Sequence, residues 1–143
     1  MAMKTIFAAL GIFCLASQPA LAQQQGYDVL IKNTCDSEMR IVIRYLTPSG
    51  SWHTGYWYTL AAGAQTYLSS SGARIRHATL EHGIGIYGET GDGRGMFGRP
   101  IGSDTGPERY VIKLNDSEYV LGRSADMTTR EDDIYLRLHC NDR

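Results

Sequence analysis

Five side chains with aromatic rings lie within residues 52–58, and they are the most distinctive chemical feature of this chain. They are Trp52, His53, Tyr56, Trp57 and Tyr58. Flat rings exposed on a sheet stack well on sugar faces and on the side chains of other proteins. The chemistry expected of this segment is therefore recognition of a ligand.

Strand geometry divides these rings between two faces. Side chains alternate along a strand, so Trp52, Tyr56 and Tyr58 share one side while His53 and Trp57 take the other. One of the two sets must fill the core. If the first set is buried, His53 and Trp57 remain outside, and we predict these two as ligand-binding residues.

A glycine-rich segment at residues 89–108 holds a second candidate. Its sequence, ETGDGRGMFGRPIGSDTGPE, contains six glycines and two prolines and has almost no periodicity. A connection this long inside a compact domain is usually functional or disordered. The adjacent apolar pair Met96 and Phe97 either tucks back onto the core or is displayed to a partner. We include both residues among the ligand-binding candidates.

Catalytic arrangements are poorly supported. Asp104-Thr105-Gly106 spells the tripeptide of aspartic proteases, but no apolar strand precedes it, and Asp-Thr-Gly is also ordinary turn composition. The serines at 69–71 lack a Gly-x-Ser-x-Gly elbow. The histidines lie on separate segments and are expected at surface or half-buried positions: His53, His77, His82 and His139. We predict no catalytic residue, no metal and no cofactor, although paired carboxylates are a three-dimensional feature that a sequence leaves open.

The N-terminal segment predicts export. Residues 1–22 carry one positive charge at Lys4, an apolar stretch, and small residues at Ala20 and Ala22, which is the pattern of a secretory signal peptide cleaved after Ala22. The apolar stretch is too short to span a membrane. The remainder, residues 23–143, suits a single domain with one core. We therefore expect a periplasmic or secreted protein.

Cysteine usage agrees with export. Cys14 leaves with the signal peptide, so Cys35 and Cys140 remain as an even pair, which is most simply read as one disulfide. Neither cysteine has a histidine or carboxylate at metal-ligand spacing. The predicted bridge ties the end of the first strand to the end of the last, and places the two ends of the domain side by side.

The elements that must position these groups are short alternating segments. In residues 39–45, Met39, Ile41, Ile43 and Tyr45 point to one side while the even-numbered residues, two of them arginines, point to the other. Further strands are expected at 27–32, 52–60, 65–68, 74–81, 84–87, 110–114, 119–121 and 134–140, and residues 123–133 have room for one helical turn. The pattern predicts an all-β fold: a β-sandwich or small barrel of about eight antiparallel strands, with one disulfide joining the first and last.

Net charge excludes some partners. The formal net charge is −1 and no long run of one sign occurs. Binding of nucleic acid or of an anionic membrane needs clustered Lys and Arg, so neither is expected.

Part of the chain resembles a family of uncharacterised small secreted bacterial domains. The resemblance covers about a third of the domain and is carried by Asn33-x-Cys35, Tyr45, Trp52, Gly55-Tyr56-Trp57 and the turn from Leu60 to Gly63. In that family the turn reads Leu-x-Pro-Gly, whereas Ala62 stands at the proline position here. The resemblance implies export and an all-β fold, and it implies no activity, substrate or catalytic residue.

These observations predict an exported, non-catalytic binding or interaction module whose ligand is an envelope glycan or another protein. Two alternatives stay open. One is a small hydrolase acting on cell-envelope polysaccharide, which predicts a cleft with two facing carboxylates or a histidine beside one. The other is an inhibitor or immunity-type protein of an exported enzyme, which predicts a protruding 89–108 loop with Met96 and Phe97 at its tip.

Overall fold

The computed structural model describes residues 26–55, 57–101, 103, 106–124 and 126–140. Within these ranges the chain forms β-strands and no helix, which confirms the predicted all-β fold. The strands are β1 (Tyr27–Asn33), β2 (Met39–Leu46), β3 (Trp52–Thr54), β4 (Tyr58–Leu60), β5 (Gln65–Tyr67), β6 (Ser69–Ser70), β7 (Ala73–Arg74), β8 (Arg76–His77), β9 (Gly85–Thr90), β10 (Met96–Phe97), β11 (Arg99–Ile101), β12 (Val111–Lys113), β13 (Tyr119–Leu121), β14 (Arg123–Ser124), β15 (Asp126–Arg130) and β16 (Asp133–Leu138).

These strands outnumber the eight or so expected, because several predicted strands are split into shorter ones. In the described part of the chain, no helix is long and apolar enough to cross a membrane. The predicted signal peptide, residues 1–22, lies outside the described residues.

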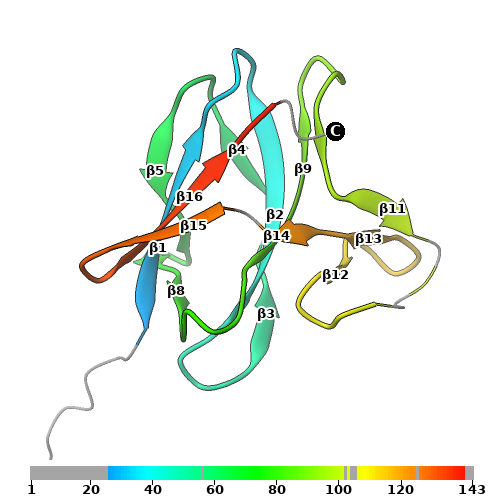
Figure 1. Ribbon diagram of the computed structural model, residues 1–143. Coiled ribbons are helices and arrows are strands. Elements are labelled where there is room, and N and C mark those ends of the chain that lie inside the picture. The colour runs from blue at the N-terminus through cyan, green and yellow to red at the C-terminus, as the bar shows by residue number, and fades with distance from the viewer. Residues whose placement is uncertain (1–25, 56, 102, 104–105, 125, 141–143) are drawn as a thin grey trace, which may run out of the picture.

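Two sheets pack face to face as a β-sandwich (Figure 1). The five-stranded sheet has the order β15-β16-β1-β5, with β8 also pairing with β1. The six-stranded sheet has the order β10-β9-β2-β3, with β4 also pairing with β2 and β14 with β9. A three-stranded sheet, β11-β13-β12, and the β6–β7 hairpin complete the fold. The two large sheets enclose the core between them.

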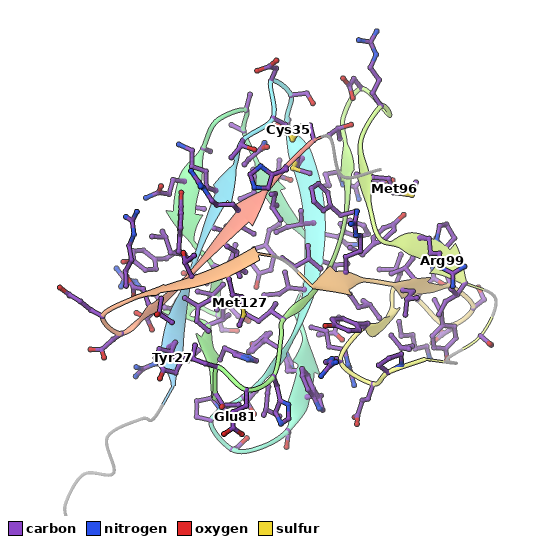
Figure 2. The ribbon with its side chains drawn as sticks, in the orientation of Figure 1. Tyr27, Cys35, Glu81, Met96, Arg99 and Met127 are labelled. Carbon is purple, nitrogen blue, oxygen red and sulfur yellow. A yellow bond between two sulfur atoms is a disulfide. The ribbon has the colours of Figure 1, made fainter. Side chains whose placement is uncertain are left out.

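The core is built from alternate residues of both sheets, as strand periodicity requires. In β2 the predicted apolar set is buried: Met39, Ile41 and Ile43 are fully buried and Tyr45 is nearly so. The opposite sheet contributes Val29, Ile31, Ile134, Leu136 and Leu138, all fully buried. Figure 2 shows Met127 of β15 reaching toward this interior, and its side chain packs against the core cluster.

The first and last strands are neighbours, and they run parallel rather than antiparallel. β1 pairs with β16 in register from Asp28 opposite Asp133 to Asn33 opposite Leu138. Both strands lead to a cysteine, and the predicted Cys35–Cys140 disulfide is present with its Cα atoms 5.4 Å apart. Two adjacent strands whose C-terminal ends are tied together must run in the same direction. The antiparallel expectation is therefore wrong for this pair, although most other pairings are antiparallel.

A buried amide fixes the turn that carries Cys35. The side chain of Asn33 is fully buried, and its amide nitrogen donates to the carbonyl oxygens of Ser37, Leu60 and Ala61 at 2.9–3.1 Å. Its side-chain oxygen accepts a hydrogen bond from the Cys35 backbone N–H at 2.9 Å. These bonds satisfy a buried polar group that is otherwise costly, and they explain why asparagine precedes this cysteine by two.

The glycine-rich segment contributes short strands to two of the sheets. β9 continues to Thr90, a turn follows, β10 pairs back on β9, and β11 joins the three-stranded sheet. Gly98 makes the step between β10 and β11 possible: its φ is +79°, and a Cβ there would overlap the carbonyl oxygen of Leu121. The expectation of a long connection without regular structure is therefore wrong for residues 96–101, where two short strands lie, while residues 91–95 form a turn.

A hairpin replaces the helical turn expected within residues 123–133. β15 pairs antiparallel with β16, and Glu131 adopts a φ of +54° in the turn between them. The segment is polar because β15 is an edge strand with most of its length exposed, so its apolar periodicity is too weak to show in the sequence.

His77 is fully buried, whereas the sequence predicted a surface or half-buried residue. Its Nδ1 accepts a hydrogen bond from the Leu46 backbone N–H at 3.2 Å, and its Nε2 lies 2.6 Å from the carbonyl oxygen of His82. Burial is the main cause that lowers the pKa of His77. This histidine is a neutral structural residue that links β8 to β2.

Candidate binding face

The two tryptophans share one face of the six-stranded sheet because the pairing register shifts between β3 and β4. Residues of β3 pair with β2 such that Thr54 lies opposite Arg44, whereas in β4 Tyr58 lies opposite Ile41. The step from Thr54 to Tyr58 is four residues, whereas the step from Arg44 to Ile41 is three, so the first segment carries one extra residue, which is the signature of a β-bulge. One extra residue reverses the facing of everything beyond it. Simple alternation, which paired Trp57 with His53, is therefore wrong here.

Trp57 lies on the outer face of the sheet, away from the core. The Arg40 guanidinium carbon is 4.8 Å from the centre of the indole, and the Tyr87 ring meets the indole edge-on with centroids 6.1 Å apart. The indole remains 37% exposed. A cation over one ring face and a ring at its edge hold the side chain in a defined orientation.

Met96 belongs to the same face. It pairs with Glu89 of β9, and Glu89 in turn pairs with Arg40 of β2. Arg40 also pairs with Thr59 of β4, so the four side chains form one row across β10, β9, β2 and β4. At about 4.8 Å per strand, this row is roughly 14 Å wide. Met96 is 44% exposed, and Figure 2 shows it at the periphery of the molecule. We call Arg40, Trp57, Tyr87, Glu89 and Met96 the Trp57–Met96 face.

A second, small apolar cluster packs next to this face and shares Tyr87 with it. Val42 and Tyr87, the outward residues of β2 and β9, pack against Ile112 and Val120 of the three-stranded sheet, and all four are buried. The chain can approach this closely because Gly85 has no side chain: a Cβ there would overlap the carbonyl oxygen of Arg109. The three-stranded sheet therefore covers the outer side of Val42 and Tyr87, whereas Trp57 and Met96 stay exposed.

The electrostatics of the face are mixed in sign. Arg40 and Glu89 are cross-strand neighbours, one positive and one negative. Burial raises the pKa of Tyr87, and the nearby charges of Glu89 and Glu118 raise it further. The Tyr87 hydroxyl therefore stays protonated at neutral pH. The face offers a cation, an anion and a neutral hydroxyl around two exposed apolar groups.

Two of the four predicted ligand-binding residues come together, and two do not. Trp57 and Met96 share the outer face. Phe97 points inward and is 6% exposed within the core cluster. His53 lies on the core-facing side of β3, where its ring meets that of the buried Tyr45 edge-on at 5.5 Å, although it is itself exposed. Tyr56, the remaining ring of the segment, lies outside the described residues.

Sequence reasoning missed Arg40, Tyr87 and Glu89. The pattern in β2 does place Arg40 on the outer side, but only the sheet order brings it next to Trp57 and Glu89. Tyr87 reads as one more apolar strand residue. Its role depends on the three-stranded sheet, of which β12 and β13 match expected strands, whereas β11 lies within the glycine-rich residues 89–108, where no strand is expected.

The described residues hold no group of three or more His, Cys, Asp or Glu side chains arranged to bind a metal. A hollow of about 540 Å³ lies beside the disulfide and is lined by Asp36, Asp92 and Arg94 among others. The carboxylate of Asp92 already accepts hydrogen bonds from the Thr90 hydroxyl at 2.6 Å and from the Arg94 backbone N–H at 3.0 Å. These bonds, which lower the pKa of Asp92, explain its placement without a ligand.

Comparison with known proteins adds no relative. No protein-family model, curated protein or solved structure matches this chain. The resemblance to small secreted bacterial domains thus rests on its residues alone, and the candidate function must be argued from the geometry of the Trp57–Met96 face.

Proposed function

We propose that this protein is an exported, non-catalytic interaction module that binds a partner protein through the Trp57–Met96 face. The observation that carries the proposal is the placement of Trp57 and Met96, exposed by 37% and 44%, in one region of a rigid sheet with Arg40 between them. Aromatic residues, methionine and arginine are the types enriched at protein–protein interfaces. Tryptophan and arginine also dominate interface hot spots.

The geometry favours a protein over a glycan. A sugar platform needs flat rings with free faces, and one face of Trp57 is already covered by the Arg40 guanidinium. Trp52, the other tryptophan of this side, is only partly exposed, with the Arg44 guanidinium 6.0 Å from its ring centre. A flexible methionine adapts well to an apolar side chain of a partner. A peptide segment carrying an apolar residue fits this arrangement better than a sugar ring does.

Export and the absence of catalysis are part of the same proposal. Export is supported by the signal-peptide pattern of residues 1–22 and by the Cys35–Cys140 disulfide, because such bonds persist in oxidising compartments. A non-catalytic role is supported by His77, the fully buried histidine, because both of its ring nitrogens are engaged by backbone groups. A histidine held in this way has no free nitrogen for proton exchange with a substrate.

The test is retention of proteins from the extracytoplasmic fraction of the source cells on immobilised protein, followed by titration of the purified partner. Trp57→Ala should weaken the affinity by about 2 kcal/mol or more, the loss expected of a hot spot. Met96→Ala should weaken it by about 1 kcal/mol, because a flexible side chain contributes less. Both variants should stay folded, since neither residue belongs to the main core cluster.

Leu80→Ala is the matched control. Leu80 is 42% exposed, so it presents as much apolar side chain as Met96, but it lies outside the Trp57–Met96 face. The affinity of the Leu80→Ala variant for the purified partner should equal that of the unchanged protein. Equal loss in Trp57→Ala and Leu80→Ala, or binding of purified polysaccharide in place of any protein, would refute the proposed function.

A further inference from the structure

β15 (Asp126–Arg130) is the longest strand that lies at the edge of a sheet in the described part of the chain. It pairs with β16 on one side, and no described strand pairs with its other side. The turn between β15 and β16 lies at the periphery of the molecule (Figure 1). The other edge strands have three residues or fewer. Short edge strands resist pairing with other chains, whereas a longer one presents a row of unpaired backbone groups. β15 is therefore the edge best able to accept another strand.

The unpaired backbone groups of β15 belong to Met127 and Thr129. The backbone N–H of Thr34, directly after β1, donates to the carbonyl oxygen of Leu138 at 3.1 Å, so Leu138 and the other even-numbered residues of β16 face β1. Backbone groups alternate in direction along a strand, so the odd-numbered residues of β16 face β15. Their partners in β15 are Asp126, Thr128 and Arg130. The N–H and C=O groups of Met127 and Thr129 consequently point to the open edge.

The β15 strand of a second copy can satisfy these groups. In an antiparallel pair about a twofold axis at Thr128, Met127 lies opposite Thr129 of the second copy, and each such pair exchanges both backbone hydrogen bonds. The same register sets Asp126 opposite Arg130 of the second copy at both ends. Registers centred on Met127 or on Thr129 place no acidic residue opposite Arg130. Opposite charges therefore select the register centred on Thr128.

The composition of β15 suits this pairing. Threonine is a favoured strand residue, and two threonines directly opposite each other can form a hydrogen bond. Thr128, Thr129 and Arg130 are exposed, so they are accessible to a second strand. β15 has no proline, and its pairing with β16 runs without a bulge, so two common protections of an edge are missing. Met127 packs against the core cluster and anchors the strand.

We propose that this protein forms a homodimer in which the β15 strands of two copies pair antiparallel about Thr128. The five-stranded sheets of the two copies then become one continuous sheet across the twofold axis. The contact is isologous, because the same strand serves both copies. One pair of short strands buries a small area, so the dimer is weak and depends on concentration. β15 and the Trp57–Met96 face belong to different sheets, so failure of this proposal leaves the proposed function intact.

The experiment is sedimentation equilibrium of the purified protein between about 1 μM and about 1 mM. We expect a monomer–dimer equilibrium with a Kd of about 100 μM or tighter. Arg130→Asp puts two acidic residues opposite each other at both ends of the pairing, and Asp126→Arg puts two basic residues there. Each variant alone should dimerise at least about tenfold more weakly. An equimolar mixture of the two variants should dimerise as tightly as the unchanged protein, because it restores opposite charges at both ends.

Arg99→Asp is the matched control. Arg99 is an exposed arginine on β11, an edge strand of the three-stranded sheet, and its replacement changes the net charge as much as Arg130→Asp does. The Kd for dimerisation of this variant should equal that of the unchanged protein.

Thr129→Pro tests the backbone contact without changing the charge. Proline removes the Thr129 N–H, which points to the open edge, and leaves the hydrogen bonds between β15 and β16 in place. Dimerisation should weaken by about tenfold or more, because one hydrogen bond is lost from each copy. Thermal unfolding checks the fold of every variant, and Thr129→Pro decides the matter if a charge variant is unstable.

Three results would overturn the proposal. The unchanged protein could stay monomeric at about 1 mM. The mixture of Arg130→Asp and Asp126→Arg could dimerise as weakly as either variant alone. Arg99→Asp could weaken dimerisation as much as Arg130→Asp.

Discussion

The two faces of the six-stranded sheet are built from the same strands and yet differ in what covers them. On the inner face, Met39, Ile41 and Ile43 are fully buried against the opposite sheet. On the outer face, the alternate residues Arg40, Val42 and Arg44 meet a small apolar cluster, two tryptophans and open solvent. Apolar side chains on the inner face hold the fold together. Those left exposed on the outer face are available to a partner.

Removal of the disulfide, which lies on the inner side, should cause the largest loss of stability. Cys35 belongs to the inner cluster and Cys140 packs against it. The bridge joins residues 105 apart in sequence, and closing a loop of that length stabilises the folded state by about 4–5 kcal/mol on the chain-entropy account. The double variant Cys35→Ser/Cys140→Ser should lose that much in urea unfolding under oxidising conditions. An unchanged unfolding midpoint would show that the bridge has no structural role.

Two methionines sharpen the comparison, because the same residue type occupies both faces. Met39 is fully buried on the inner face and Met96 is 44% exposed on the outer face. Met39→Ala should lower the free energy of unfolding by about 2–5 kcal/mol through the cavity it leaves. Met96→Ala should change it by no more than about 0.5 kcal/mol. Equal losses in the two variants would contradict the assignment of inner and outer faces.

The smallest expected effect is a pH dependence that arises on the inner side. The pKa of His77 is lowered, mainly by burial, from the value of about 6.5 that holds in the unfolded chain. Below about pH 6.5 His77 binds a proton in the unfolded chain but stays neutral in the folded protein, because its pKa there is lower. The free energy of unfolding therefore falls as the pH falls below about 6.5. Above it this contribution is constant.

Urea unfolding at pH 7.5 and at pH 5.5 measures this contribution. The His77→Gln variant removes the titrating group and keeps a side chain that can accept a hydrogen bond from the Leu46 backbone N–H. The loss of stability between the two pH values should be smaller in the variant. If both proteins lose the same amount, another group is responsible, with His82, whose carbonyl oxygen contacts His77, the first to examine.

What the sequence predicts well follows from alternation and from cysteine pairing. The apolar set of β2 is buried as predicted, because one face of a strand in a sandwich must meet the core. The Cys35–Cys140 bridge follows because assigning Cys14 to the predicted signal peptide leaves two cysteines, which can pair only with each other. The edges of β1 and β16 are also close to their predicted bounds, since their alternation is strong.

What the sequence does not predict depends on how strands pair. The shift that moves Trp57 onto the face of Trp52 arises because β3 and β4 pair with β2 in different registers. Gly55 is the one local signal of it, because an isolated glycine in a strand pattern often marks a bulge. Residues 89–108 contain short strands whose partners lie elsewhere in the chain, so their glycines suggest an irregular loop. Arg40, Glu89 and Met96 meet only through the sheet order, which no local pattern encodes.

The central claim is that Trp57, and not His53, belongs to the Trp57–Met96 face. Photo-crosslinking tests this claim most directly. The two residues are four apart in one segment, and simple alternation puts them together, whereas the structure puts them on opposite sides of the sheet. A photoreactive phenylalanine analogue replaces Trp57 in one protein and His53 in another, each irradiated with extracytoplasmic proteins. We predict a discrete protein adduct from position 57 and none from position 53. The same adduct from both positions, or none from position 57, would contradict the account.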